Sequence, residues 1–341
     1  MNRKLLLLLA ALLLAGCSAR DSTPRAGETA TRVHSRPVRS KLSAITLLCN
    51  ISPPAGTVRV KRLALSSDGS LVAAVINDNI RDRLRIWRSR DGHSLLALEP
   101  DYGLTDISWR PSKPLLAFYG ATGEPMTPDA PINRGFGIVD ATTKHVRSRL
   151  DIDLGERVAF DWLPDGSGIA TSHFVLDTRT WHYRRYDLGN DPPSTVTRQI
   201  SVSCHHDVAR ETASRQTGLP NIRVFRSQTS GFGPFTDSAG LSSATDLDTN
   251  NTVIRTQPRF LASGDLAFVK ASLDPYGLQT SVEVWTCRRD CKDERPWVRI
   301  PRLGEGAFGP YSFAPVACSA DGRVVAYVYG LTVRVFRVAS R

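Results

Sequence analysis

The stretch that decides the fold runs from Val60 to Leu98. It reads Val60-Lys-Arg-Leu-Ala-Leu65, Ser-Ser-Asp68-Gly69, an apolar run from Leu71 to Ile76, Leu84-Arg-Ile-Trp87, Asp91-Gly92 and Leu95-Leu-Ala-Leu98. Asp-Gly pairs favour tight hairpins because both central residues of a type I′ turn need a positive φ. The run from Leu71 to Ile76 is apolar at consecutive positions, as in a strand that is buried on both faces. The stretch therefore predicts four short antiparallel strands joined by three turns.

The third strand of this unit, which alternates apolar residues and ends on an aromatic one, recurs along the chain. Its matches are Ile222-Arg-Val-Phe225, Val282-Glu-Val-Trp285 and Val333-Arg-Val-Phe336, with a weaker Phe136-Gly-Ile-Val139. First-hairpin turns occur at Asp68-Gly69, Ser112-Lys113, Asp165-Gly166, near Asp207, at Gly264-Asp265 and at Asp321-Gly322. These turns predict six units about 40 to 60 residues apart, and the uneven spacing leaves a seventh open. No later stretch sustains a 3.6-residue apolar period, so helices should be few.

At these residues the chain resembles the WD40 and TolB-like β-propeller families, from roughly Lys41 to the C terminus. The resemblance implies an all-β fold that consists of a single propeller. Two departures are visible, because Arg88 follows Trp87 where a WD40 repeat has Asp, and no Gly-His pair opens a blade. Propellers include binding modules and enzymes alike, so the resemblance predicts architecture and leaves the function open.

Ring closure has a candidate at the N-terminal end of the domain. The chain ends on a third strand, Thr332 to Val338, which leaves the last blade one strand short. Residues Ser43 to Ile51 form an unassigned strand before the first blade. We expect this N-terminal strand to complete the last blade, because this arrangement covers an edge that would otherwise pair with other chains. The alternative is an extra edge strand on the first blade.

The first residues carry a targeting pattern. Arg3 and Lys4 precede a leucine and alanine run that is too short to span a bilayer and ends in Leu14-Ala-Gly-Cys17. This pattern resembles a bacterial lipoprotein signal, which implies that residues 1–16 are removed and that Cys17 is acylated. Ser18 follows the cysteine, which resembles the sorting pattern of outer-membrane lipoproteins facing the periplasm. The alternative is an ordinary secretory signal that is cleaved near Ala19.

Charge is concentrated next to this signal. The formal net charge is +11, and loss of Arg3 and Lys4 would leave +9. Residues Ser18 to Lys41 hold six basic and two acidic side chains, or +4, among Ser, Thr and Pro residues. Residues 17–41 are therefore predicted to be a disordered, lipidated tether attracted to anionic headgroups, with the propeller domain at 42–341. Export argues against a nucleic-acid partner despite the pI of 9.7.

The remaining cysteines fit an oxidising compartment. Cys287 and Cys291 flank three residues between two strands of a hairpin, which places their Cα atoms within disulfide reach. We therefore predict a disulfide between these two residues. Cys204 and Cys318 are expected to be buried in the core as free thiols, and the pairing of Cys49, Cys204 and Cys318 is left open.

No metal site, cofactor or catalytic residue is predicted. Cys204-His-His-Asp207 offers ligand types, but successive strand residues face opposite sides. Asp246-x-Asp248-x-Asn250 begins like a calcium loop and lacks the later Gly and Glu. The chain contains no Gly-x-Ser-x-Gly elbow and no His-Glu-x-x-His pair.

Loop lengths indicate where binding takes place. The loops between the second and third strands of a blade, and those between successive blades, open on one face, here named the long-loop face. The longest loops fall there, at Asn77 to Arg83, Gly120 to Arg134, Thr212 to Asn221, Ala271 to Thr280 and Arg302 to Ser312. Gln228 to Asn251 is interpreted as a separate flexible insertion. Arginine and aromatic residues are enriched at binding hot spots, so the predicted binding residues are Arg81, Arg83, Tyr102, Arg134, Tyr276, Phe308 and Tyr311.

Two functions follow from these features. The first is a membrane-anchored, non-catalytic scaffold that binds an envelope protein or polymer on the long-loop face. The alternative is a hydrolase or lyase acting on envelope glycans or peptides from the same face or from the central channel. The second function needs carboxylates or histidines that cluster around the propeller axis, and the first does not.

Overall fold

The computed structural model describes residues 42–100, 103–121, 134–150, 159–171, 174–185, 199–205, 207–213, 219–227, 241–246, 253–273, 279–288, 293–300 and 314–339. All regular structure in these ranges is β-strand. The described part of the chain has no helix long and apolar enough to cross a membrane.

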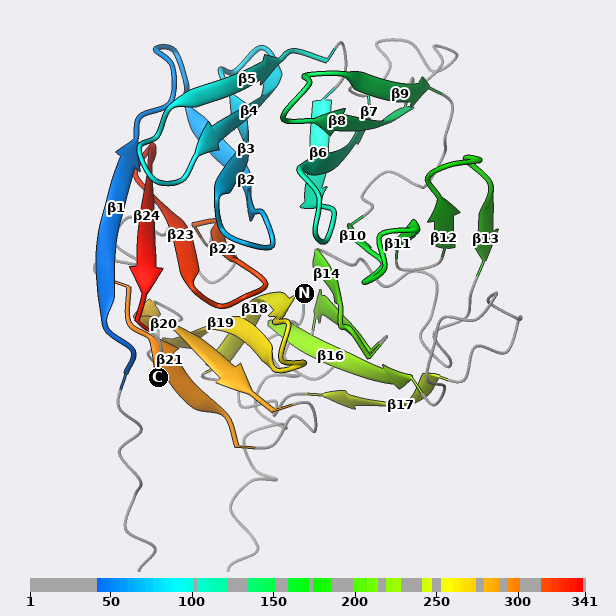
Figure 1. Cartoon of the computed structure of the whole chain (residues 1–341). Coiled ribbons are helices and arrows are strands. Elements are labelled where there is room, and N and C mark those ends of the chain that lie inside the picture. Colours follow the sequence, from blue (N-terminus) through cyan, green and yellow to red (C-terminus); the bar gives the residue numbers. More distant parts are fainter. Residues whose placement is uncertain are drawn as a thin grey trace, which may run out of the picture. The chain divides into compact units, whose positions relative to one another are not determined.

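The described strands form six four-stranded antiparallel sheets, numbered here as blades (Figure 1). Blade 1 holds β2 (Arg59–Leu65), β3 (Leu71–Asn77), β4 (Asp82–Arg88) and β5 (Ser94–Leu98). Blade 2 holds β6 (Gly103–Trp109), β7 (Leu115–Ala121), β8 (Arg134–Asp140) and β9 (Val146–Leu150). Blade 3 holds β10 (Phe160–Trp162), β11 (Gly168–Thr171), β12 (Phe174–Asp177) and β13 (Tyr183–Arg185).

The second half of the ring repeats this plan. Blade 4 holds β14 (Gln199–Val202), β15 (Val208–Ala213), β16 (Pro220–Ser227) and β17 (Leu241–Asp246). Blade 5 holds β18 (Val253–Phe260), β19 (Leu266–Leu273), β20 (Gln279–Cys287) and β21 (Arg295–Val298). Blade 6 holds β22 (Val316–Cys318), β23 (Val324–Tyr329), β24 (Thr332–Val338) and β1 (Ile45–Ile51).

The six sheets stand around a common axis as a β-propeller (Figure 1). In blades 1 to 5 the first strand is innermost and the others follow outward in chain order, and in blade 6 the outward order is β22, β23, β24 and β1. The predicted third-strand signatures lie in β4, β8, β16, β20 and β24, each the third strand of its blade. The all-β fold and the six-bladed count are therefore confirmed.

The N-terminal strand closes the ring, as predicted. β1 runs antiparallel to β24, with Ile45 opposite Val338 and Ile51 opposite Val333 (Figure 1). The main-chain N–H of Ser43 also donates to the carbonyl of Trp297 in the neighbouring blade 5, at 3.0 Å. The last blade is thus completed by the first strand of the domain.

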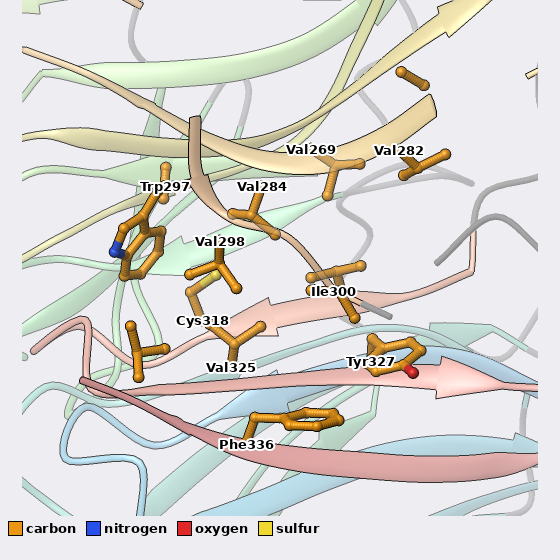
Figure 2. Packing of buried hydrophobic residues seen from close by; sticks show 14 of the residues in the cluster. Val269, Val282, Val284, Trp297, Val298, Ile300, Cys318, Val325, Tyr327 and Phe336 are labelled. Carbon is orange, nitrogen blue, oxygen red and sulfur yellow. The ribbon is translucent and has the colours of Figure 1, made fainter. Parts of the chain in front are cut away.

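Apolar side chains fill the spaces between blades. In β3, the residues from Val72 to Ile76 are at most 2% exposed, as expected for a strand that is buried on both faces. Figure 2 shows the packing between blades 5 and 6, where Trp297 and Val298 lie in one cluster with Tyr327 and Phe336. The faces of the sheets therefore supply most of the contact that holds neighbouring blades together.

The first hairpin of blade 1 approaches blade 6 so closely that only glycine fits. Gly69 has a φ of +69°, and a Cβ atom built on it would lie 2.5 Å from Cγ2 of Val324. The predicted Asp68-Gly69 turn thus serves both the hairpin and the contact between the first and last blades.

Two expectations about loops need correction. The β3–β4 loop has only residues 78–81, and β11 and β12 are also closely spaced, so the long-loop face includes short loops. Thirteen residues, 228–240, separate β16 from β17 in the sequence and lie outside the described ranges. β17 pairs with β16, so the predicted insertion from Gln228 to Asn251 includes the outer strand of blade 4. A polar edge strand lacks the apolar pattern that identifies inner strands.

The cysteines are only partly as expected. Cys318 is 7% exposed at the end of β22, whereas Cys204 is exposed and its predicted burial is wrong. β14 ends at Val202, and the Ser203 hydroxyl then accepts the N–H groups of His205 and Asp207, so Cys204 falls in the turn. Cys287 is buried and Cys291 lies outside the described residues, so their disulfide stays a prediction.

Closure by β1 predicts unequal effects of two alanine substitutions in this strand. Ile51 is 2% exposed within the cluster between blades 6 and 1, whereas Leu47 is 47% exposed. We expect Ile51→Ala to lower the free energy of unfolding by about 2–5 kcal/mol, because it opens a cavity there. Leu47→Ala should change it by about 0.5 kcal/mol or less. Denaturant titration measures both, and equal effects of the two variants would argue that β1 does not hold the ring closed.

Candidate functional site

Two of the seven predicted binding residues have described side chains, and both belong to the β3–β4 region of blade 1. Arg81 is exposed in the loop, and Arg83 is half-buried in β4. Arg134 is the first residue of β8, on the long-loop face, with only its main chain described. Tyr102, Tyr276, Phe308 and Tyr311 lie outside the described residues, and their role in binding stays a prediction.

The β3–β4 loop is fixed by its own polar side chains. The Asp78 carboxylate accepts the N–H groups of Ile80 at 3.0 Å and Arg81 at 2.8 Å. The N–H of Arg81 is the main cause that holds the pKa of the Asp78 carboxyl below its usual value. Asn79 has a φ of +75°, and its N–H donates to Oδ1 of Asn77 at 2.9 Å. The loop therefore has one defined conformation before any ligand binds.

Arg83 contributes to this loop instead of facing a partner. Its Nη2 lies 2.9 Å from Oδ2 of Asp78, and its Nε lies 3.3 Å from Oε1 of Glu99. Arg83 thus ties the loop to the outer strand of its own blade. Arg81 differs, because its exposed guanidinium makes no ion pair with any residue that the structure describes.

An apolar side chain stands at the tip of this loop. Ile80 is 84% exposed, the most of any large hydrophobic residue among those described. Val58 and Leu331 are also exposed and belong to the same face, since they lie in the connection from blade 6 to blade 1 and in the β23–β24 turn. The N–H of Val58 donates to the carbonyl of Asn77 at 2.9 Å, so this connection abuts the loop.

We name Val58, Ile80 and Arg81 the blade 6/1 patch. Sequence reasoning missed its two apolar members because each is an isolated apolar residue in a loop. The only sequence signal is the isolated isoleucine in Asn79-Ile80-Arg81, where a loop of this kind would ordinarily be polar throughout.

A second candidate lies on the axis. A cavity of ≈ 80 Å³ is lined by residues of all six innermost strands, β2, β6, β10, β14, β18 and β22. Its charged residues are Arg62, Asp106, Asp161 and Arg259. Two carboxylates therefore converge on the axis, which is the arrangement that the hydrolase alternative requires.

The Asp161 carboxylate is fully engaged with neighbouring blades. It accepts from the Ser108 hydroxyl of blade 2 at 2.5 Å and from the Val202 N–H of blade 4 at 3.1 Å. Nη1 of Arg259, in blade 5, lies 3.1 Å from each of its oxygens. One buried side chain thus connects four consecutive blades.

Asp106 has a similar role and is also buried. It accepts the N–H of Phe160 in blade 3 at 3.1 Å and lies 3.5 Å from Nε of Arg62 in blade 1. Burial raises the pKa of the Asp106 carboxyl to about 6, although Arg62 and the N–H donors favour the ionised form. Burial destabilises the ionised Asp106 carboxylate, and its contacts with blades 1 and 3 offset part of this desolvation cost.

The same device recurs at other junctions. In each case a side-chain oxygen of one blade accepts a main-chain N–H of the next blade. The Asp82 carboxylate accepts the N–H of Leu104 at 2.8 Å, the Glu211 carboxylate accepts the N–H of Gln257 at 2.9 Å, and the Gln257 amide oxygen accepts the N–H of Val316 at 2.5 Å. These links explain why acidic residues occur inside otherwise apolar strands. They give the axial carboxylates a structural role that does not require catalysis.

The two sequence motifs with metal-ligand residue types, Cys204 to Asp207 and the one that begins at Asp246, do not form a metal site in the described residues. Cys204 and His205 lie in the β14–β15 turn and are exposed, whereas Asp207 is 1% exposed. Asp246 ends β17, and the rest of that motif lies outside the described residues. No group of three or more His, Cys, Asp or Glu side chains that could hold a metal ion occurs in the ranges that the structure covers.

The raised pKa of Asp106 predicts a pH dependence of stability. The folded state binds the proton of the Asp106 carboxyl more tightly than the unfolded state does. The contribution of this carboxyl to the free energy of unfolding is therefore greatest below about pH 4 and is lost as the pH rises through about 6. The fall amounts to about 3 kcal/mol. Asp106→Asn should remove it, so the parent should lose stability relative to the variant between pH 4 and pH 7 in denaturant titrations. A constant difference between them would contradict this assignment.

Comparison with known proteins supports the fold. No protein-family model matches the chain, and no curated protein matches its sequence. Among solved structures, the WD40 repeats of RRP9 match with a TM-score of 0.51 and 9% identity, over 88% of this chain and 99% of that chain. U3-55K matches with a TM-score of 0.52 and 10% identity, over 86% and 98%.

A third solved structure, hydrazine synthase of Kuenenia stuttgartiensis, has a TM-score of 0.52 and 11% identity, over 80% of this chain and 74% of that chain. Such low identities establish architecture alone, and the three neighbours include one that is named as an enzyme. The chain therefore has the β-propeller fold of WD40 repeat proteins, and its function has to be argued from its own surface.

Proposed function

We propose that this protein is a lipid-anchored scaffold of the cell envelope that binds an envelope protein or polymer on its long-loop face, and that it performs no catalysis. The observation that carries the proposal is the β3–β4 loop, which holds Ile80 84% exposed in a fixed conformation. A loop whose main chain is already ordered loses little conformational entropy on binding, so burial of the Ile80 side chain contributes more of its free energy to affinity.

The chemistry of the blade 6/1 patch favours a protein partner or a polymer with apolar groups. It combines the exposed Val58 and Ile80 side chains with the Arg81 guanidinium, which has five donors to offer to a carboxylate or a carbonyl. Apolar centres with an arginine are typical of protein-binding hot spots. A partner with an apolar contact and a nearby acidic group would complement this patch.

The direction of β1 supports this choice of face. Ile51 leads into the connection on the long-loop face, so Ile45 lies at the opposite face, where the chain enters the domain. If Cys17 is the anchor, the tether joins the propeller at the face opposite the long-loop face, so it does not begin on the proposed binding face. Residues 17–41, as a flexible chain, would reach roughly 30 Å.

The size of the axial cavity gives the hydrolase alternative little support. Its volume of ≈ 80 Å³ accommodates a few water molecules, whereas pockets for sugars or peptides measure about 300–1,000 Å³. Its carboxylates are also engaged with main-chain N–H groups of neighbouring blades.

Photocrosslinking in intact cells tests the proposed face. A photoreactive p-benzoyl-phenylalanine in place of Ile80 should yield a specific crosslinked product. The same residue in place of Arg323, whose side chain is 74% exposed on the opposite face, should not. Equal products from both positions, or none from position 80, would count against the proposal.

Once the partner is captured, its affinity can be measured. Ile80→Ser should weaken binding by about 30-fold, the equivalent of a hot-spot loss of about 2 kcal/mol, without changing the melting temperature. Trp87→Ala is the contrasting variant, because Trp87 is 4% exposed in the core and its loss should lower stability by about 3–5 kcal/mol.

The anchor has its own test. Metabolic labelling with a fatty acid should depend on Cys17, and Cys17→Ser should release the protein from the membrane fraction, because the acylated thiol is lost. Equal labelling of the variant would exclude this anchor without affecting the proposed binding face.

A further inference from the structure

A pocket on the face opposite the long-loop face has the chemistry of an anion site. It measures ≈ 350 Å³ and lies between blades 1 and 2. Blade 1 contributes Arg88 at the end of β4 and His93, and blade 2 contributes Lys144 from the β8–β9 turn. This volume lies within the usual range of small-molecule sites, about 300–1,000 Å³.

Every charged or titratable side chain of this lining is basic. The described lining residues include no acidic side chain, and the Ser94 and Thr142 hydroxyls add two further donors. The apolar part of the lining consists of Leu71, Leu95 and Ala141. The pocket therefore combines several hydrogen-bond donors with an apolar wall.

The acidic residues next to the pocket are engaged in their own turns. Asp140 accepts the N–H groups of Thr142 at 2.7 Å and Thr143 at 3.2 Å. Asp91 accepts the His93 N–H at 3.0 Å, and its other oxygen is shared by Arg88 at 3.2 Å and Arg90 at 3.4 Å. Asp91 occupies only one of the five N–H donors of Arg88, so the guanidinium can still bind a second anion.

A repeated turn holds the basic residues in place. In blades 1, 2 and 3 the turn before the outer strand has a left-handed residue, Gly92, Lys144 or Trp181, with φ of +69°, +62° and +62°. The next residue is an exposed histidine in each case, and its carbonyl closes the turn. Lys144 adopts a backbone conformation that is costly for a side chain with a Cβ, in a position where blade 1 has glycine.

We propose that this pocket binds a phosphate group that is attached to an apolar body. A carboxylate presents two oxygens, whereas a phosphate monoester presents three, which better match the donors of Arg88, His93, Lys144 and the two hydroxyls. The apolar wall receives the body of the ligand. The phosphate monoester has two sources, a soluble phosphate ester or the headgroup of phosphatidic acid, and the second source rests on the membrane anchor proposed above.

Calorimetric titration of the full chain carrying Cys17→Ser tests the pocket without its anchor. We expect saturable binding of phenyl phosphate that is tighter than that of inorganic phosphate and of benzoate. Arg88→Gln and Lys144→Gln should each weaken binding about 10-fold. Arg90→Gln is the matched control, because Arg90 is next to the pocket and does not line it.

Vesicles of phosphatidic acid, which carries a phosphate monoester, and of phosphatidylcholine, in the same assay, separate the two sources. Binding to phosphatidic acid vesicles that Lys144→Gln weakens would assign a lipid headgroup, and binding of phenyl phosphate alone would assign a soluble ester. The proposal is overturned if millimolar phenyl phosphate gives no saturable binding. It is also overturned if Arg90→Gln weakens binding as much as the pocket variants. Neither result bears on the photocrosslinking at position 80.

Discussion

The pairing of β1 with β24 places both ends of the domain in one sheet, and the circular arrangement depends on it. Six blades that pack through apolar faces could equally form an open arc, with one face of the first blade and one of the last in water. The β1–β24 ladder removes that option because residues from both ends of the domain share the hydrogen bonds of a single sheet. The cluster between blades 6 and 1, which includes Ile51, Trp87 and Val335, is then buried like the others.

Closure creates an axis where six strands converge, and the axis is polar. Several main-chain N–H groups of the inner strands, among them those of Leu104, Phe160 and Val202, have their partner in another blade. Side-chain oxygens of the preceding blade supply that partner at several junctions, and Asp161 does so while paired with Arg259. Indole groups reinforce these links in the reverse direction, since Trp162 donates to the carbonyl of Ser108 at 3.0 Å. The apolar faces provide most of the burial, and this polar belt restricts how each blade is placed against the next.

Local signals explain why the architecture could be predicted from the sequence. Asp68-Gly69 and the apolar run after it specify a hairpin without reference to the rest of the chain. Counting strands showed that the last blade lacked one strand, which β1 supplies.

Longer-range features could not be found in this way. Asp106 and Asp161 are isolated acidic residues in the sequence, and their convergence depends on strands about fifty residues apart. Ile80 is apolar within a polar loop, and only the hydrogen bonds of Asp78 show that it is held outward. Cys204 was misplaced because the Ser203 side chain ends β14 early.

The direction of β1 has a mechanical consequence. A protein held by its N-terminal tether and bound to a partner at the opposite face carries tension along β1, parallel to its ladder with β24. Load applied in this direction shears the ladder, so the hydrogen bonds between Ile45 and Ile51 resist it together. A strand pulled from the side would instead unzip one pair at a time. The strand that completes the ring is thus also oriented so that its whole ladder shares a load applied at its N-terminal end.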